Sequence, residues 1–502
     1  MSTNASLSKP IRSRWCCWSV MLLTLGVTGC SLAPSYERPA LPVPQTQQAS
    51  VLVEGFGLSS TPTEIGLSQN EEHLIAELSP EGGLRPLVQL SLSFNRDFRV
   101  AFLRIEEAQS LYLTARSDRM PTVAAGFERD RQQFDNAAIN ERYGQDLTFA
   151  SVGISNFELD FFGRVRSLSE AARHDYLATI YGQQSARSAL IAEVARLYLL
   201  ERLTAVQQVD ARLIDDAEQT ILGRVEGQQV EGAASFDDVA SQHAKAQDAH
   251  LRLAAATAEH ARSLQALLLV TGYAKPLPPM NNVESVEVAP ADLGTPHWLV
   301  DMPSQRLLER FDVRQSEERL KAANANIGAP RAAFFPSIKL STGIGIASDS
   351  LRTLFEGGNG TWLFSPQLSL PLFDGGRNRA NLNLAEVRKQ MAVAQYEKTV
   401  QTAFREMADV LTERQHVLER VHSEKVLSAL AQSKAQRTLA ELEAGGADRT
   451  LLLASQIRVA QADMVWQQAR QALLLNRLDI YRVLCGVDTA PAQRLSDNES
   501  LQ

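Results

Sequence analysis

The sequence of 502 residues lacks cysteine pairs, a strong charge imbalance and long apolar runs. Its four cysteines form no CxxC pair and have no histidine nearby, which excludes a zinc module and a dense disulfide scaffold. The formal charge of −8 offers no basic balance, so no nucleic-acid partner is expected. The longest apolar runs fall well short of the ~20 residues of a membrane-spanning helix, which excludes a polytopic helical membrane protein.

Patterns typical of an active site are also missing. His243, His250 and His260 are seven and ten residues apart, unlike the i, i+4 histidine pair of a zinc helix. The segment 356–360 (EGGNG) lacks the lysine of a phosphate-binding loop, and the segment 342–346 (TGIGI) alternates like a strand and opens no helix. We therefore expect a protein that is not an enzyme and that needs no cofactor and no metal.

The N-terminus has the pattern of a lipoprotein signal peptide. Basic residues precede an apolar stretch at 15–25, and small residues then lead to Cys30. This ending resembles the lipobox of bacterial lipoproteins, which implies cleavage after residue 29 and a covalent lipid on Cys30. The alternative is a signal peptide that merely contains a cysteine. Ser31, rather than an aspartate, follows and by analogy favours sorting to the outer membrane. Residues 30–65 begin with several prolines and are expected to form an extended tether.

The rest of the chain is a tandem duplication. Asp97-x-Arg99 lies 24 residues before Pro121, and Asp312-x-Arg314 lies 24 residues before Pro336. Further matches at a nearly constant offset of 213–215 residues include Gly232 with Gly445. We assign repeat 1 to 66–275, a linker to 276–300, repeat 2 to 301–487 and a tail to 488–502. Each repeat is expected to begin with a moderate helix, at 95–119 and 312–332.

Two strands are predicted in each repeat, at 122–132 and 146–157, and at 337–347 and 361–373. Ile338, Leu340 and Ile344 point to one face of their strand, and small or polar residues point to the other. The length, ~9–11 residues, is that of a transmembrane β-strand. The alternative is an ordinary soluble hairpin. Four strands cannot close a barrel, and open edges are not tolerated in hydrocarbon, so membrane-spanning strands would require several chains to share one barrel.

Two very long helices follow the strands of each repeat, at 165–224 and 235–271, and at 377–443 and 448–485. A 60-residue helix is about 90 Å long. Apolar residues such as Val393, Tyr396 and Val400 recur at alternating steps of three and four, the pattern of a coiled coil. Each long helix is predicted to turn back at a corner that contains glycine, Gly232 in the first repeat and Gly445-Gly446 in the second.

Several motifs in this order resemble the outer-membrane efflux protein family, the TolC-like ducts, and specifically its lipoprotein branch that serves RND-type pumps. They are 95–101 (NRDFRVA), 157–166 (FELDFFGRVR), 331–336 (RAAFFP) and 370–377 (LPLFDGGR). The resemblance implies a mainly α fold with a membrane β-barrel. In this fold, three identical chains form a homotrimer. Each chain contributes four strands to a twelve-stranded membrane barrel, and the long helices form a periplasmic α-barrel. It also implies docking to a periplasmic adaptor and an inner-membrane RND-type transporter.

The corners are the candidate functional site, as a periplasmic gate or adaptor-binding tip. Family members often carry Leu-Asp-Ala-Gln after the second corner, where this chain has 453–456 (LASQ), so that acidic ring is not supplied here. Asp237, Asp238 and Asp448, which lie at the corners, could form another ring that attracts cations. Alternatively, they could be solvated acids that stabilise helix starts. The candidate residues are Gly232, Asp237, Asp238, Gly445, Gly446, Asp448 and Arg449.

Two functions remain from these patterns. The first is a passive outer-membrane exit duct of a tripartite efflux system, which conducts drugs or other small molecules and is energised by its inner-membrane partner. The second is a periplasmic coiled-coil lipoprotein with a structural, tethering role. The strands favour the duct, because a tether has no use for apolar hairpins at equivalent points of a duplication. Selection of the cargo is expected to lie mainly in the transporter.

Overall fold

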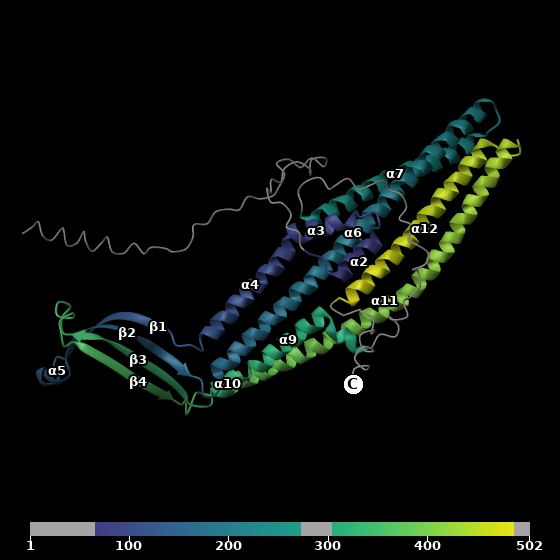
Figure 1. Cartoon of the computed structure of the whole chain (residues 1–502). Helices are drawn as coiled ribbons and strands as arrows, with labels where there is room; N and C mark the ends of the chain where they lie inside the picture. The colour runs from purple at the N-terminus through teal and green to yellow at the C-terminus, as the bar shows by residue number, and fades with distance from the viewer. Residues whose placement is uncertain (1–65, 273–303, 486–502) are drawn as a thin grey trace, which may run out of the picture. The chain divides into compact units, whose positions relative to one another are not determined.

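The computed structural model describes residues 66–272 and 304–485, which all belong to one unit of the chain, Gly57–Gln502. The structure is mostly helical with a small antiparallel sheet, as expected, and both halves follow one order of elements (Figure 1). The first half contains α2 (Gln69–Leu78), α3 (Leu84–Phe94), α4 (Arg96–Ser117), β1 (Val123–Gln132), α5 (Ala137–Tyr143), β2 (Gln145–Leu159), α6 (Arg164–Val230) and α7 (Phe236–Thr271). The second contains η2 (Ser304–Glu309), α9 (Phe311–Ala325), α10 (Gly328–Ala332), β3 (Ser337–Ser348), β4 (Gly360–Ser369), α11 (Arg377–Glu443) and α12 (Arg449–Val483).

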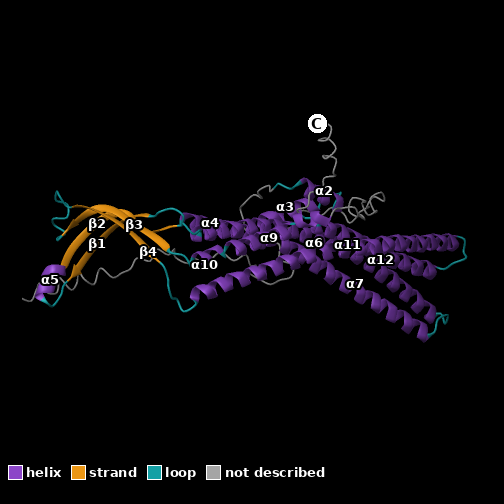
Figure 2. Ribbon diagram, turned by 90° about the horizontal axis from the view of Figure 1, so that it is seen from below, coloured by secondary structure: helices purple, strands orange, loops and turns teal. Residues whose placement is uncertain are grey.

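The four strands form one curved antiparallel sheet in the order β1-β2-β3-β4 (Figure 2). The register places apolar side chains opposite each other on one face, where Val152 pairs with Ile344 and Ile344 with Trp362. Ile344 is 71% exposed and Trp362 is 76% exposed. The opposite face carries mainly small and polar residues. The sheet therefore presents a largely exposed apolar face, which is covered at the Thr148 end of β2.

A β-bulge keeps this face continuous along β2. The pairing with β3 shifts between Ile154 and Phe157, and Asn156 adopts a positive φ of 54° and donates its N–H to Ser341 Oγ at 3.0 Å. The extra residue returns Phe157 to the same face as Ile154. Simple alternation would place these two residues on opposite faces. The expected strand ends at residue 157, whereas β2 continues to Leu159, and the bulge within it leaves no clear signal in the sequence.

Other elements also differ from those expected. β4 ends at Ser369 rather than 373. Asp374 then accepts hydrogen bonds from the N–H groups of Gly376 and Asn378 and shapes the turn into α11. α6 continues six residues beyond the predicted end, since Gly223 and Gly227 weaken a helix without ending it. The helix expected at 312–332 is divided into α9 and α10.

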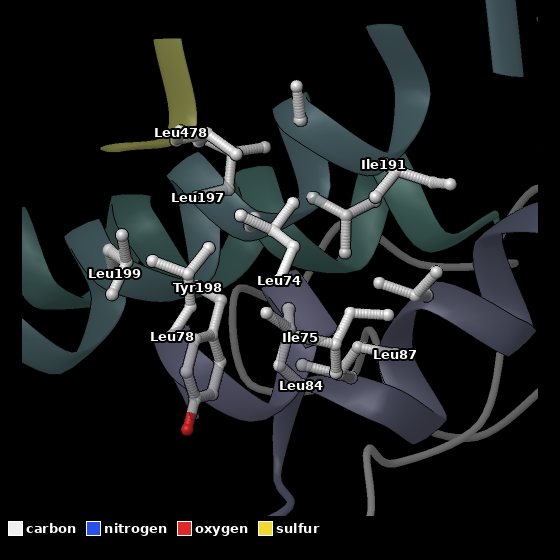
Figure 3. Close-up of a cluster of buried hydrophobic side chains, with 14 of the residues drawn as sticks. Leu74, Ile75, Leu78, Leu84, Leu87, Ile191, Leu197, Tyr198, Leu199 and Leu478 are labelled. Carbon is white, nitrogen blue, oxygen red and sulfur yellow. The ribbon is translucent and has the colours of Figure 1, made fainter. Parts of the chain in front are cut away.

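The long helices form two hairpins, α6 with α7 and α11 with α12 (Figure 1). α6 and α11 each contain 67 residues, which corresponds to about 100 Å. None of the described helices has a stretch apolar enough to cross a lipid bilayer. The core lies where α2 and α3 pack on the middle of α6, together with residues of α7 and α12 (Figure 3). It includes Leu74, Leu78, Leu197, Tyr198, Leu267 and Leu478.

Glycine allows β2 and β3 to approach closely. A Cβ atom on Gly345 would lie 2.3 Å from the carbonyl oxygen of Ala150 and 2.8 Å from Ser151 Cα. Gly126 on β1 pairs with the same Ser151 from the other side, but a Cβ there would meet no atom within 4 Å. The β2–β3 pair therefore depends on glycine, whereas the β1–β2 pair does not.

We expect Gly345→Ala to destabilise the sheet by about 1–3 kcal/mol, because the added methyl group must push two backbones apart. Thermal unfolding of the detergent-purified protein, followed by circular dichroism in the strand region, measures this loss. Gly126→Ala is the matched control and should unfold like the unmodified protein. Equal unfolding temperatures for both variants would show that the close approach does not matter.

Candidate functional site

The two corners have the same backbone geometry. Gly232 and Gly445 lie just beyond the ends of α6 and α11 with φ values of 76° and 77°. The Gly232 N–H donates to the Gln229 carbonyl, and the next N–H donates to the Gln228 carbonyl. The second corner repeats both bonds, with Leu442 and Glu441 as acceptors. This is a Schellman motif, which needs a left-handed residue and so explains both glycines.

Gly446 is different from the other two corner glycines. It does not have a positive φ, and its role in the motif is to donate its N–H to the Glu441 carbonyl at 2.8 Å. A Cβ there would come no closer than 3.6 Å to another atom, that same carbonyl oxygen. The fold of the corner therefore requires glycine at Gly445 but not at Gly446.

Two of the three candidate acids are helix caps. Asp238 forms a capping box with Ser235, in which its carboxylate accepts from the Ser235 N–H at 2.9 Å and the hydroxyl at 2.6 Å. These hydrogen bonds, first from the side chain and then from the backbone of Ser235, hold the pKa of Asp238 below its usual value. Asp448 is the N-cap of α12 and accepts from the Leu451 N–H at 2.7 Å. Stabilisation of helix starts accounts for both.

The two remaining charged candidates form no cap. Asp237 lies in the first turn of α7, where its negative charge is favourable to the helix dipole. Asp237 and Arg449 are exposed, and neither forms a hydrogen bond or ion pair with another residue of the described segments. Arg449 is the first residue of α12, where a positive charge opposes the helix dipole. A residue that costs local stability and contacts nothing within its own chain is a good candidate for contact with another molecule.

The first corner also exposes apolar side chains that the sequence analysis did not select. Val230 is 89% exposed and Phe236 is 77% exposed, on either side of Gly232. Leu451, beside the second corner, is 51% exposed. The sequence did contain a signal for this surface, namely apolar residues immediately next to a predicted helix corner. Exposed apolar groups at such a position indicate a contact surface.

The segment 453–456 contributes no acid to this site. Leu453 and Ile457 pack against Ala217 and Ile221 of α6, and the Ser455 hydroxyl donates to the Leu452 carbonyl. The segment 453–456, which lacks an acidic residue, therefore serves the packing of α12 on α6. In the turn into repeat 2, α9 begins at Phe311. Buried Arg310 fixes this turn through bonds to Asp312 and Glu406.

The described segments contain no cluster of three or more histidine, cysteine, aspartate or glutamate side chains that could hold a metal ion. Two of the three histidines of α7 have structural contacts, whereas His243 is exposed. His250 lies 3.7 Å from Asp215, and His260 bridges Glu201 and Gln208 of α6. Cys30, the predicted lipid site, lies outside the described residues.

Comparison with known proteins gives consistent results. The family model described as outer membrane efflux protein matches residues 87–273 and 302–486. The cation efflux system protein CusC of Escherichia coli O6:H1 is 33% identical over 92% of this chain and 97% of its own length. Outer membrane protein OprJ of Pseudomonas aeruginosa is 36% identical over 83% of each chain.

Solved structures show the same relationship. A crystal structure of CusC matches with a TM-score of 0.68 and 31% identity, over 91% of this chain and 99% of that one. The open state of the Neisseria gonorrhoeae MtrE outer membrane channel matches with a TM-score of 0.66 and 28% identity, over 91% and 98%.

The capping interpretation of Asp448 predicts different effects of two substitutions. Asp448→Ala should lose the cap and destabilise α12 by about 1 kcal/mol, whereas Asp448→Asn should keep it, because asparagine caps equally well. Local hydrogen exchange of residues 449–455 measures the difference. If the asparagine variant exchanged as fast as the alanine variant, the charge of Asp448 and not its cap would be the stabilising feature.

Proposed function

The chain belongs to the outer membrane efflux protein family, and from this we propose that three copies of it form one exit duct. The protein is an outer-membrane efflux channel that extends into the periplasm and serves a tripartite efflux system. The observation that carries the trimer is the four-stranded sheet, whose outer strands β1 and β4 each pair on one side only. Three such sheets joined edge to edge make a closed barrel of twelve strands, in which every strand has two neighbours.

The exposed residues of the long helices support the same assembly. Leu111 on α4, Met391 on α11 and Leu430 on α11 are 63%, 66% and 60% exposed. A single chain in water would leave these apolar side chains uncovered along the helices. Neighbouring copies in a periplasmic α-barrel would cover them.

We assign the corners to the periplasmic end of the duct, where they would meet the adaptor and open. Val230 and Phe236 offer the adaptor an apolar contact, and Asp237 and Arg449 offer charges. Three copies of Asp237 around one axis would favour cations at the mouth of the duct. The inner-membrane transporter, for which we propose the RND type, would supply the energy.

Beyond a preference for cations at the mouth, the choice of cargo is expected to lie mainly in the transporter. One relative is named a cation efflux protein, and another is the toluene efflux pump outer membrane protein TtgF of Pseudomonas putida, 36% identical over 78% of this chain. Relatives with such different names share this architecture, so we propose a passive duct for drugs or other small molecules. The duct would need no cofactor beyond the covalent lipid proposed at Cys30, which would hold the tether in the outer membrane.

Conductance in planar lipid bilayers tests both the duct and its mouth. The purified protein should form channels, and Asp237→Asn should lower the preference for cations about twofold, because it removes one charge per chain from the mouth. Asp409→Asn, which removes an exposed carboxylate from the middle of α11, is the control and should leave the preference unchanged.

The outcomes separate two claims. Failure of the unmodified protein to form any channel would contradict the duct. Channels with unchanged ion preference and unchanged drug sensitivity in cells that carry Asp237→Asn would remove this residue from the mouth.

A further inference from the structure

The end of the sheet farthest from α4 and α6, which we call the far end, carries two arginines on its apolar face. Val152, which belongs to that face, pairs with Ala125 of β1. Because side chains alternate along a strand, Phe127, Arg129 and Arg131 follow Ala125 on the same face. β1 begins after α4 and β2 leads into α6, so both arginines lie at the opposite end of this hairpin, next to the connection that contains α5.

The charges of β1 are separated between its two faces. Glu128 and Asp130 alternate with the arginines and therefore lie on the opposite face, where Asp130 pairs with Leu147 of β2. In the proposed barrel the apolar face meets lipid and the opposite face lines the water-filled interior. Both acids of β1 thus face water, and both arginines face the lipid side.

The arginines lie just beyond the apolar part of this face. On β3 the apolar residues run from Ile338 to Ile346, which at ~3.4 Å per residue is about 27 Å along the strand. A tilt of ~40° reduces this length to about 21 Å, close to the ~25 Å apolar band of membrane barrels. Ile346 and Phe127 pair with the same residue of β2 and end the band in one row. Arg129 is one row beyond it and Arg131 two rows beyond it, at the level of the lipid headgroups.

A single carboxylate faces both arginines. Arg129 donates from Nε and Nη2 to the two oxygens of Asp146 at 3.0 and 3.1 Å. Arg131 Nε lies 3.7 Å from the same carboxylate, which is too far for a hydrogen bond. Among the described residues Arg131 has no other ion pair, and its side chain is 71% exposed. These three side chains therefore have one surplus positive charge, and the donors of Arg131 are available to another molecule.

The neighbouring side chains do not neutralise this charge. Thr148 and Ser348 continue the row of Arg129 across β2 and β3, and both are buried and uncharged. Asp349, which follows β3, accepts hydrogen bonds from the hydroxyls of Ser348 and Thr353. The exposed charge at the far end of the apolar face is thus concentrated on β1.

We propose that Arg129 and Arg131 bind the phosphate groups of an anionic lipid in the outer leaflet of the membrane. A guanidinium group fits phosphate oxygens through two parallel hydrogen bonds, and its apolar stem can lie along the hydrocarbon boundary. Phe127, which is 62% exposed, would contact the acyl chains below the headgroup. Asp146 competes with the phosphate for both arginines. This inference rests on the proposed barrel, in which the corners are periplasmic and the far end of the sheet therefore lies at the outer leaflet.

Binding of fluorescent diphosphoryl lipid A to the full-length protein in detergent tests the site, with the apparent Kd as the readout. Arg129→Gln and Arg131→Gln should each weaken binding about fivefold, the usual effect of one basic side chain at an anionic lipid surface. Arg131→Lys keeps the charge and should weaken binding only about twofold. Circular dichroism in the strand region checks that each variant is folded.

Asp146→Asn gives the sharpest test, because it should tighten binding about two- to fivefold. It removes the competing charge, and asparagine still offers Arg129 an acceptor. Asp130→Asn is the matched control, since it makes the same change of charge on the opposite face of β1, and it should leave the apparent Kd unchanged. If Asp146 only joined β1 to β2, its substitution would not tighten lipid binding.

Three results would overturn the proposal. They are equal binding by the unmodified protein and both glutamine variants, equal binding of phosphatidylcholine, and displacement of the lipid by inorganic phosphate at equal concentration. The last would indicate a site for free phosphate. Channel formation in planar bilayers is measured on the same preparations. Absence of channels would contradict the proposed duct, whereas channels with equal lipid binding in all variants would overturn only the lipid site.

Discussion

The constraint on which the structure depends is that a strand edge cannot remain unpaired in hydrocarbon. One chain supplies four strands, and both outer strands have a free edge beside an apolar face. Water could satisfy those edges, but then the apolar face would be exposed to water. Only closure with other copies satisfies the backbone and the side chains together. In the proposed trimer the duplication serves this geometry, because each repeat would supply one hairpin of strands and one hairpin of long helices to every third of the ring.

The helical part combines a fixed middle with separable ends. The pair of helices α2 and α3 is tied to both hairpins. Glu71 forms a two-point ion pair with Arg187 of α6, at 2.8 and 2.9 Å, and Glu77 pairs with Arg477 of α12. Beyond this level, among the described residues, the hairpins are joined by the packing of α6 on α12, where Ala217 and Ile221 contact Leu453 and Ile457. Movement of the corners therefore needs no disruption of the main core.

Local patterns in the sequence were sufficient for part of this fold. The strand alternation, the proline-free helices and Gly232 with Gly445 follow from backbone sterics, which act between neighbouring residues. The bulge at Asn156 depends on pairing with β3 and was missed, as were the short helices α2, α3 and α5. Asp238 and Asp448 were considered equally as gate residues and helix caps, and only side-chain geometry assigns them as caps.

The shared barrel is tested most directly by the mass of the purified particle. Size exclusion with light scattering, corrected for bound detergent, counts the chains in each particle. Three chains of 55.2 kDa each, less the residues removed with the signal peptide, are the expected result. A monodisperse monomer that remains folded would contradict the shared barrel, because four strands alone cannot span a membrane.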